Sequence, residues 1–186
     1  MGVIVGAGIA VLVLAAVWWT VRTFNRLIRL RNQTQASWAQ IDVQLRRRHD
    51  LIPNLVEATQ GYAAHERATL AEVTAARAAA ITGGLGTADR ARAENALSTS
   101  LTRLFALGET YPELKADGRF AVLQSELTTT ENKIAYARQF FNSAVQSYNT
   151  ALETFPANLV AGLGSHGPKE YFEADAAARD IVEVRF

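Results

Sequence analysis

The fold of this 186-residue chain is decided by residues 120–155, which read FAVLQSELTTTENKIAYARQFFNSAVQSYNTALETF. Apolar side chains recur in this stretch every three or four positions, which predicts a helix that buries one face. The stripe consists of Phe120, Leu123, Leu127, Thr130, Ile134, Ala137, Phe141, Val145, Tyr148, Leu152 and Phe155. Pro156 ends this helix because proline has no N–H to donate and its ring clashes with the preceding turn. A helix roughly 50 Å long cannot bury its stripe alone, so we expect other long helices beside it.

The composition favours an all-α protein and narrows the classes of function. Alanine, leucine, arginine, glutamine and glutamate are abundant, and there are only four prolines. The net charge is +1, so no overall charge excess points to nucleic acid as a partner. The chain has no cysteine, which excludes disulfides, thiol catalysis and cysteine-ligated metals.

Residues 1–21 are predicted to be a transmembrane helix. They contain no charged side chain, and about 20 apolar residues are needed to cross the hydrocarbon core of a bilayer. Trp18 and Trp19 lie at the end of the run, where aromatic rings prefer the boundary between lipid and water. A cleaved signal peptide is the alternative, but no basic residue precedes the apolar run and tryptophans occupy the cleavage region.

The charges that follow the span predict its orientation. Arg22, Arg26, Arg29 and Arg31 come first, and the first acidic residue is Asp42. By the positive-inside rule the N-terminus is extracytoplasmic and the larger C-terminal part is cytoplasmic. The same arginines suit contact with anionic lipid headgroups, and a role in topology alone explains them equally well.

Small residues follow one face of the span. Gly2, Gly6 and Ala10 are four positions apart, a spacing that lets two transmembrane helices approach closely. The sequence therefore predicts helix–helix contact and a homo-oligomer, although glycine and alanine are common in spans for other reasons.

The span is expected to continue as a soluble helix without a linker. No glycine or proline occurs between Gly8 and Pro53, and the apolar stripe runs on through Leu27, Leu30, Thr34, Trp38, Ile41 and Leu45. We expect this helix to end at Arg46–Arg48, where basic side chains complement the helix dipole. Asp50 and Pro53 then predict a new helix over roughly 53–80.

The remaining elements complete a bundle of about four long helices. Glycines at 83–86 predict a loop, and residues 87–107 a third helix. The predicted organisation is therefore a transmembrane helix (1–21), an antiparallel helical bundle (22–156) and a C-terminal tail (157–186) in which 157–163 form a short helix.

No catalytic or metal-binding motif is found. His65-Glu66 is followed by Thr69 where a zinc protease has a second histidine. Residues 83–86 lack the lysine and hydroxyl of a phosphate-binding loop. The three histidines, His49, His65 and His166, are expected to be solvated or capping residues. We therefore predict no enzymatic activity, no metal and no cofactor.

Two long stretches resemble the LemA family of bacterial membrane proteins. The first comprises Arg31-Asn32, residues 36–48 (ASWAQIDVQLRRR), 50–56 (DLIPNLV), 61–63 (GYA) and His65-Glu66. The second comprises Phe120, residues 123–124, 126–127, 130–131 and 133–142 (KIAYARQFFN), then Tyr148-Asn149, Phe155-Pro156 and Tyr171-Phe172. The resemblance implies a single N-terminal transmembrane helix, a long antiparallel bundle and a short extracytoplasmic N-terminus. It implies no reaction or cofactor.

Several polar residues of these stretches lie off the apolar stripe or at its edge. We expect Arg138 to pair with Asp42 or Glu131, and Lys133 with acidic neighbours, because buried charges need partners. With Gln139 and Asn142 they predict a polar network between helices or subunits; a ligand site is the alternative.

Three functional hypotheses follow. The first is a non-enzymatic, membrane-anchored scaffold that self-associates or holds other membrane proteins. The second is a protein that contacts lipids and shapes the membrane. The third is a sensor or enzyme that uses His49, Asp50, His65 and Glu66.

Overall fold

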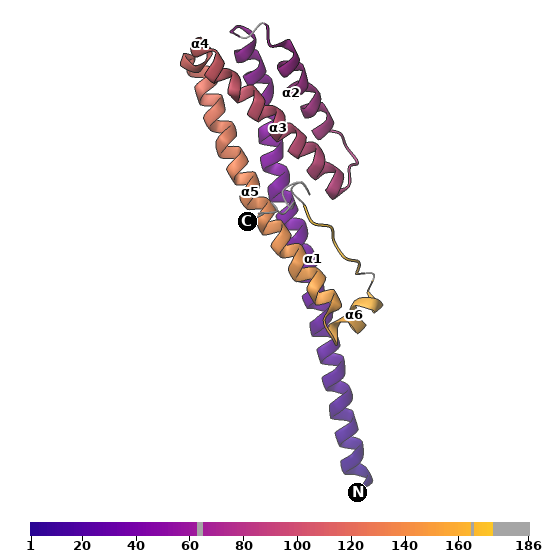
Figure 1. Cartoon of the computed structure of the whole chain (residues 1–186). Helices are drawn as coiled ribbons and strands as arrows, with labels where there is room; N and C mark the ends of the chain where they lie inside the picture. The colour runs from indigo at the N-terminus through magenta and orange to yellow at the C-terminus, as the bar shows by residue number, and fades with distance from the viewer. Residues whose placement is uncertain (63–64, 165, 173–186) are drawn as a thin grey trace, which may run out of the picture. The chain divides into compact units, whose positions relative to one another are not determined.

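The computed structural model describes residues 1–62, 65–164 and 166–172, and these residues form helices without any strand (Figure 1). The helices are α1 (Gly2–Gln60), α2 (Arg67–Ala80), α3 (Thr87–Thr110), α4 (Pro112–Ala116), α5 (Gly118–Glu153) and α6 (Ala157–Leu163). The predicted all-α class is confirmed, as is the short helix at 157–163.

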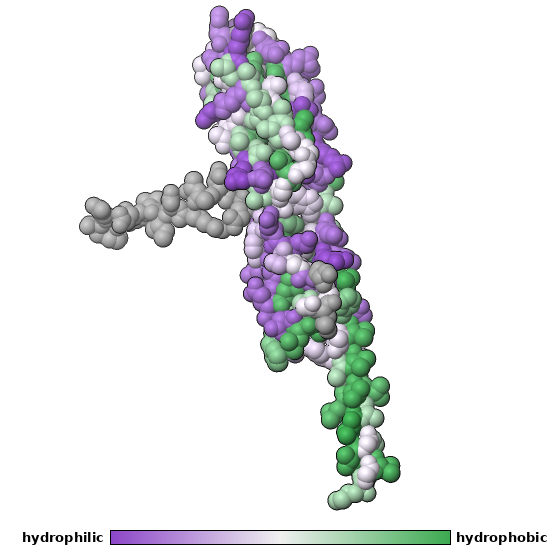
Figure 2. Space-filling model, turned by 90° about the vertical axis from the view of Figure 1, so that its right-hand side faces the viewer, coloured by the Kyte–Doolittle hydropathy of each residue, from purple (hydrophilic) through white to green (hydrophobic). Residues whose placement is uncertain are grey.

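Helix α1 continues from the apolar N-terminal stretch without a break, as expected. Its first residues are exposed, and Figure 2 shows apolar side chains gathered along this part of the helix. By length and composition the stretch is able to cross a membrane.

The predicted helix end at Arg46–Arg48 is wrong, because α1 runs on through Pro53 to Gln60. A proline inside a helix leaves the carbonyl four residues earlier without its N–H donor. That carbonyl belongs to His49, and the Nε of Arg77 on α2 donates to it over 2.7 Å. A side chain of the neighbouring helix thus replaces the missing backbone bond, which explains why Pro53 does not end the helix.

The chain divides into two compact units, of which the first comprises residues 1–38 and 140–169. Its core contains Leu27 of α1, Ala151 of α5 and Ala161 of α6. Trp38 packs against Phe141 with ring centroids 5.2 Å apart. Because Leu27 meets residue 151 while Trp38 meets residue 141, α1 and α5 are antiparallel in this unit.

The second unit comprises residues 39–139 and 170–186, of which the structure describes 39–62, 65–139 and 170–172. Helices α2 and α3 lie side by side in it (Figure 1). All four long helices contribute to one core, which contains Ile52, Leu55, Leu70, Val73, Ala80, Leu97, Leu101, Leu104, Leu114, Phe120 and Leu127. The predicted domain boundaries at residues 21 and 156 stay predictions.

The chain beyond α6 is held by specific contacts in the first unit. The Tyr148 hydroxyl and the Nδ1 of His166 share a hydrogen bond of 3.2 Å, and the His166 ring packs edge-on against Phe24. The side-chain amide of Asn149 donates to the carbonyl of Lys169 and accepts from its N–H, both at 2.9 Å. His166 is therefore not the solvated or capping residue that we expected.

The apolar stripe of α5 is confirmed with one exception. The side chains from Phe120 to Leu152 are buried or half-buried, whereas Phe155 is 75% exposed. The helix ends at Glu153, so Phe155 is not part of the helix whose continuation would place its side chain on the buried face.

Candidate functional site

The second unit encloses a cluster of charged side chains around Arg48 of α1. The Arg48 guanidinium is fully buried and forms an ion pair with Glu94 of α3, which is also fully buried. It forms a second ion pair with Glu131 of α5, Nη1 to Oε1 over 2.5 Å. Ser98 of α3 accepts a further hydrogen bond from Nη1 over 2.8 Å. One arginine thus ties three helices together.

His49, the next residue of α1, joins the cluster through the same carboxylate. Its side chain is buried, and its Nε2 lies 3.0 Å from the Oε1 of Glu94. Burial alone would raise the pKa of Glu94, but the hydrogen bond from His49 and the positive charge of Arg48 outweigh it. The pKa of Glu94 therefore lies below its ordinary value, and this carboxylate is ionised at neutral pH.

Arg138 of α5 lies at the edge of the cluster. Its Nη1 donates to the side-chain oxygen of Asn95 over 3.1 Å, and its guanidinium lies 4.8 Å from the ring centroid of the buried Phe172. Burial, followed by repulsion from Arg48, lowers the pKa of Arg138, while Glu131 and Glu94 oppose this shift. Arg138 thus helps to hold the chain near Phe172 against the bundle.

The pairings predicted for the polar network differ from those observed. Asp42 forms ion pairs with Arg46 at 2.5 Å and with Arg90 at 2.6 Å, rather than with Arg138. Lys133 is exposed and forms no ion pair with any residue that the structure describes. Glu131 and Arg138 do lie at one cluster, whereas Gln139 is exposed and Asn142 is half-buried.

Sequence reasoning missed the centre of the site. The sequence predicts Arg48 in the last turn of a helix, complementing its dipole, and His49 as a solvated or capping residue; in the structure both are buried. The overlooked signal is periodic: Arg48 continues the stripe of Ile41 and Leu45, and Glu94 continues the stripe of Leu97 and Leu101. A charged residue at a stripe position predicts a buried charge with a partner.

The other candidate acid–base residues are not gathered with His49. Asp50 and His65 are exposed, and Glu66 accepts a hydrogen bond from the hydroxyl of Tyr111 over 3.1 Å. Within the described ranges, no group of three histidine, cysteine or acidic side chains has the arrangement of a metal site. Because Arg48 and Glu94 are inaccessible to solvent, the cluster is suited to fixing helices rather than to meeting a substrate.

The residues predicted to lie at the membrane surface are all in the first unit. Trp18 is 63% exposed, Trp19 is half-buried, and the Arg22 guanidinium lies 5.4 Å from the centroid of the Trp18 ring. Arg26 and Arg29 are exposed and Arg31 is half-buried. Gly2, Gly6 and Ala10 are exposed along α1.

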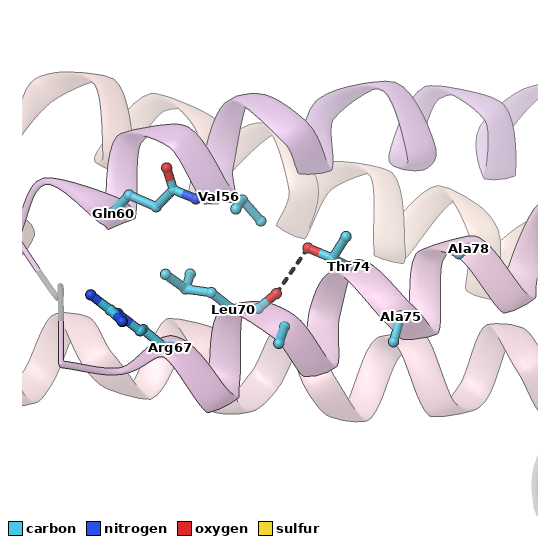
Figure 3. A pocket seen from close by; sticks show the side chains of 8 residues that line it. Val56, Gln60, Arg67, Leu70, Thr74, Ala75 and Ala78 are labelled. Atoms are coloured by element: carbon cyan, nitrogen blue, oxygen red, sulfur yellow. Dashed lines mark hydrogen bonds between the residues drawn. The ribbon is translucent and has the colours of Figure 1, made fainter.

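A groove of about 690 Å³ lies between α1 and α2 in the second unit (Figure 3). Its walls are mainly apolar, with Val56 on α1 and Leu70 and Ala75 on α2, while Gln60 and Arg67 lie at one end. The Thr74 hydroxyl donates to the carbonyl of Leu70 over 2.9 Å, so it is occupied within its own helix. The groove is a recess between helices and lacks a nucleophile paired with a base.

The model of the LemA family matches residues 37–186, which include the whole charged cluster. The chain belongs to the LemA family. It is 25% identical over 179 residues to magnetosome protein MamQ 2 of Paramagnetospirillum magneticum, covering 83% of this chain and 66% of that protein. The same values hold for magnetosome protein MamQ of Magnetospirillum gryphiswaldense. Protein LemA of Metamycoplasma hominis is 24% identical over 137 residues, covering 74% of this chain and 63% of that protein.

This LemA-family chain therefore spans slightly less than two thirds of the length of these curated relatives.

Proposed function

We propose that this LemA-family protein is a non-enzymatic scaffold, anchored in a bacterial plasma membrane by residues 1–21, that self-associates and holds partner proteins. The observation that carries the proposal is the continuity of α1. Its N-terminal residues are apolar and exposed, and the same helix supplies Ile52 and Leu55 to the core of the second unit. Helix α1 thus joins the apolar stretch to the folded second unit without a flexible linker, as an anchor for a scaffold requires.

The orientation belongs to the same proposal. The exposed Arg22, Arg26 and Arg29 follow the apolar stretch directly, and the positive-inside rule places them in the cytoplasm. The bundle is then cytoplasmic and the N-terminus extracytoplasmic.

An exposed strip on α5 supports self-association. Val122 is 62% exposed and Tyr136 is 75% exposed, and the exposed Thr129 lies midway between them. Residues seven positions apart share one side of a helix. Among the exposed positions from 121 to 136 only Lys133 is charged, and the partly exposed Glu126 in this range is paired with Arg47. Large exposed apolar side chains on a surface with few charges are typical of a protein interface.

The span offers a second contact surface. A side chain added at Gly2 or Gly6 would meet no atom within 4 Å in the described chain, so the small-residue face of α1 is open to a partner helix. Close packing of small residues is a common mode of association between transmembrane helices.

The test is the size of the full-length protein extracted in a mild detergent, measured by size-exclusion chromatography with light scattering. We expect a discrete oligomer that Tyr136→Glu weakens, because a charge is placed in the strip. Asn54→Glu adds the same charge at an exposed position of α1 and should leave the oligomer intact. A wild-type monomer that also captures no neighbour on cross-linking in cells would refute the scaffold.

A further inference from the structure

A second groove lies in the first unit, just beyond the predicted span. It has a volume of about 370 Å³ and is lined by α1, α5 and the start of α6. Thr23 and Arg26 come from α1, and Gln146 and Thr150 come from α5. We call these four residues and the space between them the juxtamembrane groove.

The polar groups of the juxtamembrane groove have unused hydrogen-bonding capacity. The exposed Arg26 forms no ion pair or hydrogen bond with the part of the chain that the structure describes, and neither do the side chains of Thr23, Gln146 and Thr150. Ser147 and Thr154, which also line it, instead donate to backbone carbonyls of α5 over 2.9 and 2.6 Å. No lining residue is acidic. The groove therefore presents one cation and several neutral donors to an anion.

The position of the groove along α1 indicates which anion it meets. Thr23 and Arg26 are two and five residues beyond Val21, which is about 3–8 Å along a helix. The polar layer on each side of the hydrocarbon core is about 5–8 Å thick. When residues 1–21 cross the bilayer, Thr23 and Arg26 lie at the depth of the lipid phosphates.

We propose that the juxtamembrane groove binds the headgroup phosphate of an anionic phospholipid in the leaflet next to the bundle. The Arg26 guanidinium pairs with the phosphate, because a charge-assisted hydrogen bond is stronger than a neutral one. The hydroxyls of Thr23 and Thr150 and the amide of Gln146 donate to the remaining oxygens. The acyl chains then lie along the apolar surface of residues 2–21. This site rests on the membrane anchoring in the proposed function and adds a specific lipid contact to it.

The experiment measures lipid binding to full-length protein in detergent micelles by native mass spectrometry. The probes are phosphatidylglycerol, zwitterionic phosphatidylcholine of the same acyl chains, and water-soluble glycerol 3-phosphate. We expect tight binding of phosphatidylglycerol only. Glycerol 3-phosphate that binds as tightly as phosphatidylglycerol would mark a site for free anions and would overturn the assignment to a lipid.

Matched variants distinguish binding of the lipid in the groove from the general attraction of basic residues for anionic lipid. Arg26→Gln should weaken phosphatidylglycerol binding about ten-fold or more, because it removes a charged hydrogen-bond donor. Arg29→Gln removes the same charge from an exposed position that does not line the groove and should cost no more than about five-fold. Thr150→Val removes one hydroxyl at constant charge and should weaken binding about two- to ten-fold. Equal effects of the two arginine variants, with none for Thr150→Val, would overturn the proposal.

The proposed function is tested separately in the same samples. Carbonate extraction reports whether the protein is anchored in membranes, and light scattering reports the oligomer. Protein that is washed from the membrane would refute both the anchor and the lipid site. Anchored, oligomeric protein whose lipid affinity none of the variants changes would refute the lipid site alone.

Discussion

Removing the buried carboxylate with Glu94→Ala should destabilise the bundle more than loss of any exposed ion pair. The substitution leaves the fully buried Arg48 guanidinium without its buried partner. Nη1 of Arg48 keeps Glu131 and Ser98, whereas Nη2 keeps, among the described residues, only the carbonyl of residue 94 at 3.3 Å. His49 also loses the carboxylate that it contacts.

The magnitude follows from this partial loss. Breaking a buried ion pair by removing one partner typically costs about 3–5 kcal/mol. Because Glu131 still compensates the charge of Arg48, we expect a value in the lower part of this range, about 3–4 kcal/mol. For a chain of this length that corresponds to a fall in Tm of roughly 6–16 °C.

The assay is thermal unfolding of the full-length protein in detergent, followed by circular dichroism at 222 nm. Glu72→Ala is the matched control, because Glu72 pairs with Arg103 at the surface, where the Arg103 side chain is exposed and the Glu72 side chain is partly exposed. Its Tm should stay close to that of the wild type. The double variant Arg48→Met/Glu94→Leu removes both buried charges and should recover most of the lost stability. A Glu94→Ala protein as stable as the control, or a double variant less stable than Glu94→Ala, would refute this account.

Three further predictions concern other contacts. The pKa of Glu94 lies below its ordinary value of 4.5, so its ionised form adds stability above about pH 4.5 that is lost as pH falls through the lower pKa of the folded state. A Glu94→Gln protein should therefore show a flatter acid limb than the wild type in a plot of Tm against pH. Arg77→Leu leaves the His49 carbonyl unpaired and should cost about 1–3 kcal/mol in thermal unfolding. The same change should cost less in a Pro53→Ala background, where a backbone N–H is restored, and equal costs in the two backgrounds would contradict this explanation. Asn149→Leu removes both hydrogen bonds to Lys169 and should speed proteolysis within residues 166–172 at unchanged helical content, whereas an unchanged cleavage rate would show that other contacts hold this segment.

Periodicity predicted α3 and α5 to within a few residues, because burial of apolar stripes decides where helices form, but the single helix predicted over 53–80 is wrong: residues 53–60 end α1, and α2 begins at Arg67. The stripes of α1 and α5 are confirmed from Leu27 to Leu45 and from Phe120 to Leu152. The same reasoning failed at Pro53, because the donor that replaces its missing N–H is Arg77, which is 24 residues away in the chain. A contact of this kind depends on how the helices pack, and a local signal such as an internal proline does not contain it.

The candidate site was harder to predict than the fold for a related reason. Arg46, Arg47 and Arg48 are identical in type, but only the third lies on the buried side of α1; Arg47 pairs with the partly exposed Glu126 at 2.7 Å. Carrying the stripe of Ile41 and Leu45 three residues further would have singled out Arg48. Its partners Glu94 and Glu131 lie on two other helices, and their pairing depends on the relative register of these helices.

That dependence on register gives the buried cluster a physical role in the proposed scaffold. Leucine and alanine stripes tolerate sliding of one helix along another, because many registers bury similar apolar area. A slip of one turn, about 5.4 Å, would move Arg48 away from Glu94 and toward the leucines that continue the same stripe of α3. An unpaired buried charge is far more costly than a poorly packed methyl group, so the arginine rejects the wrong registers even where it adds little net stability. The proposed scaffold, which would present Tyr136 and its neighbours at fixed positions, needs this selectivity more than it needs a higher melting temperature.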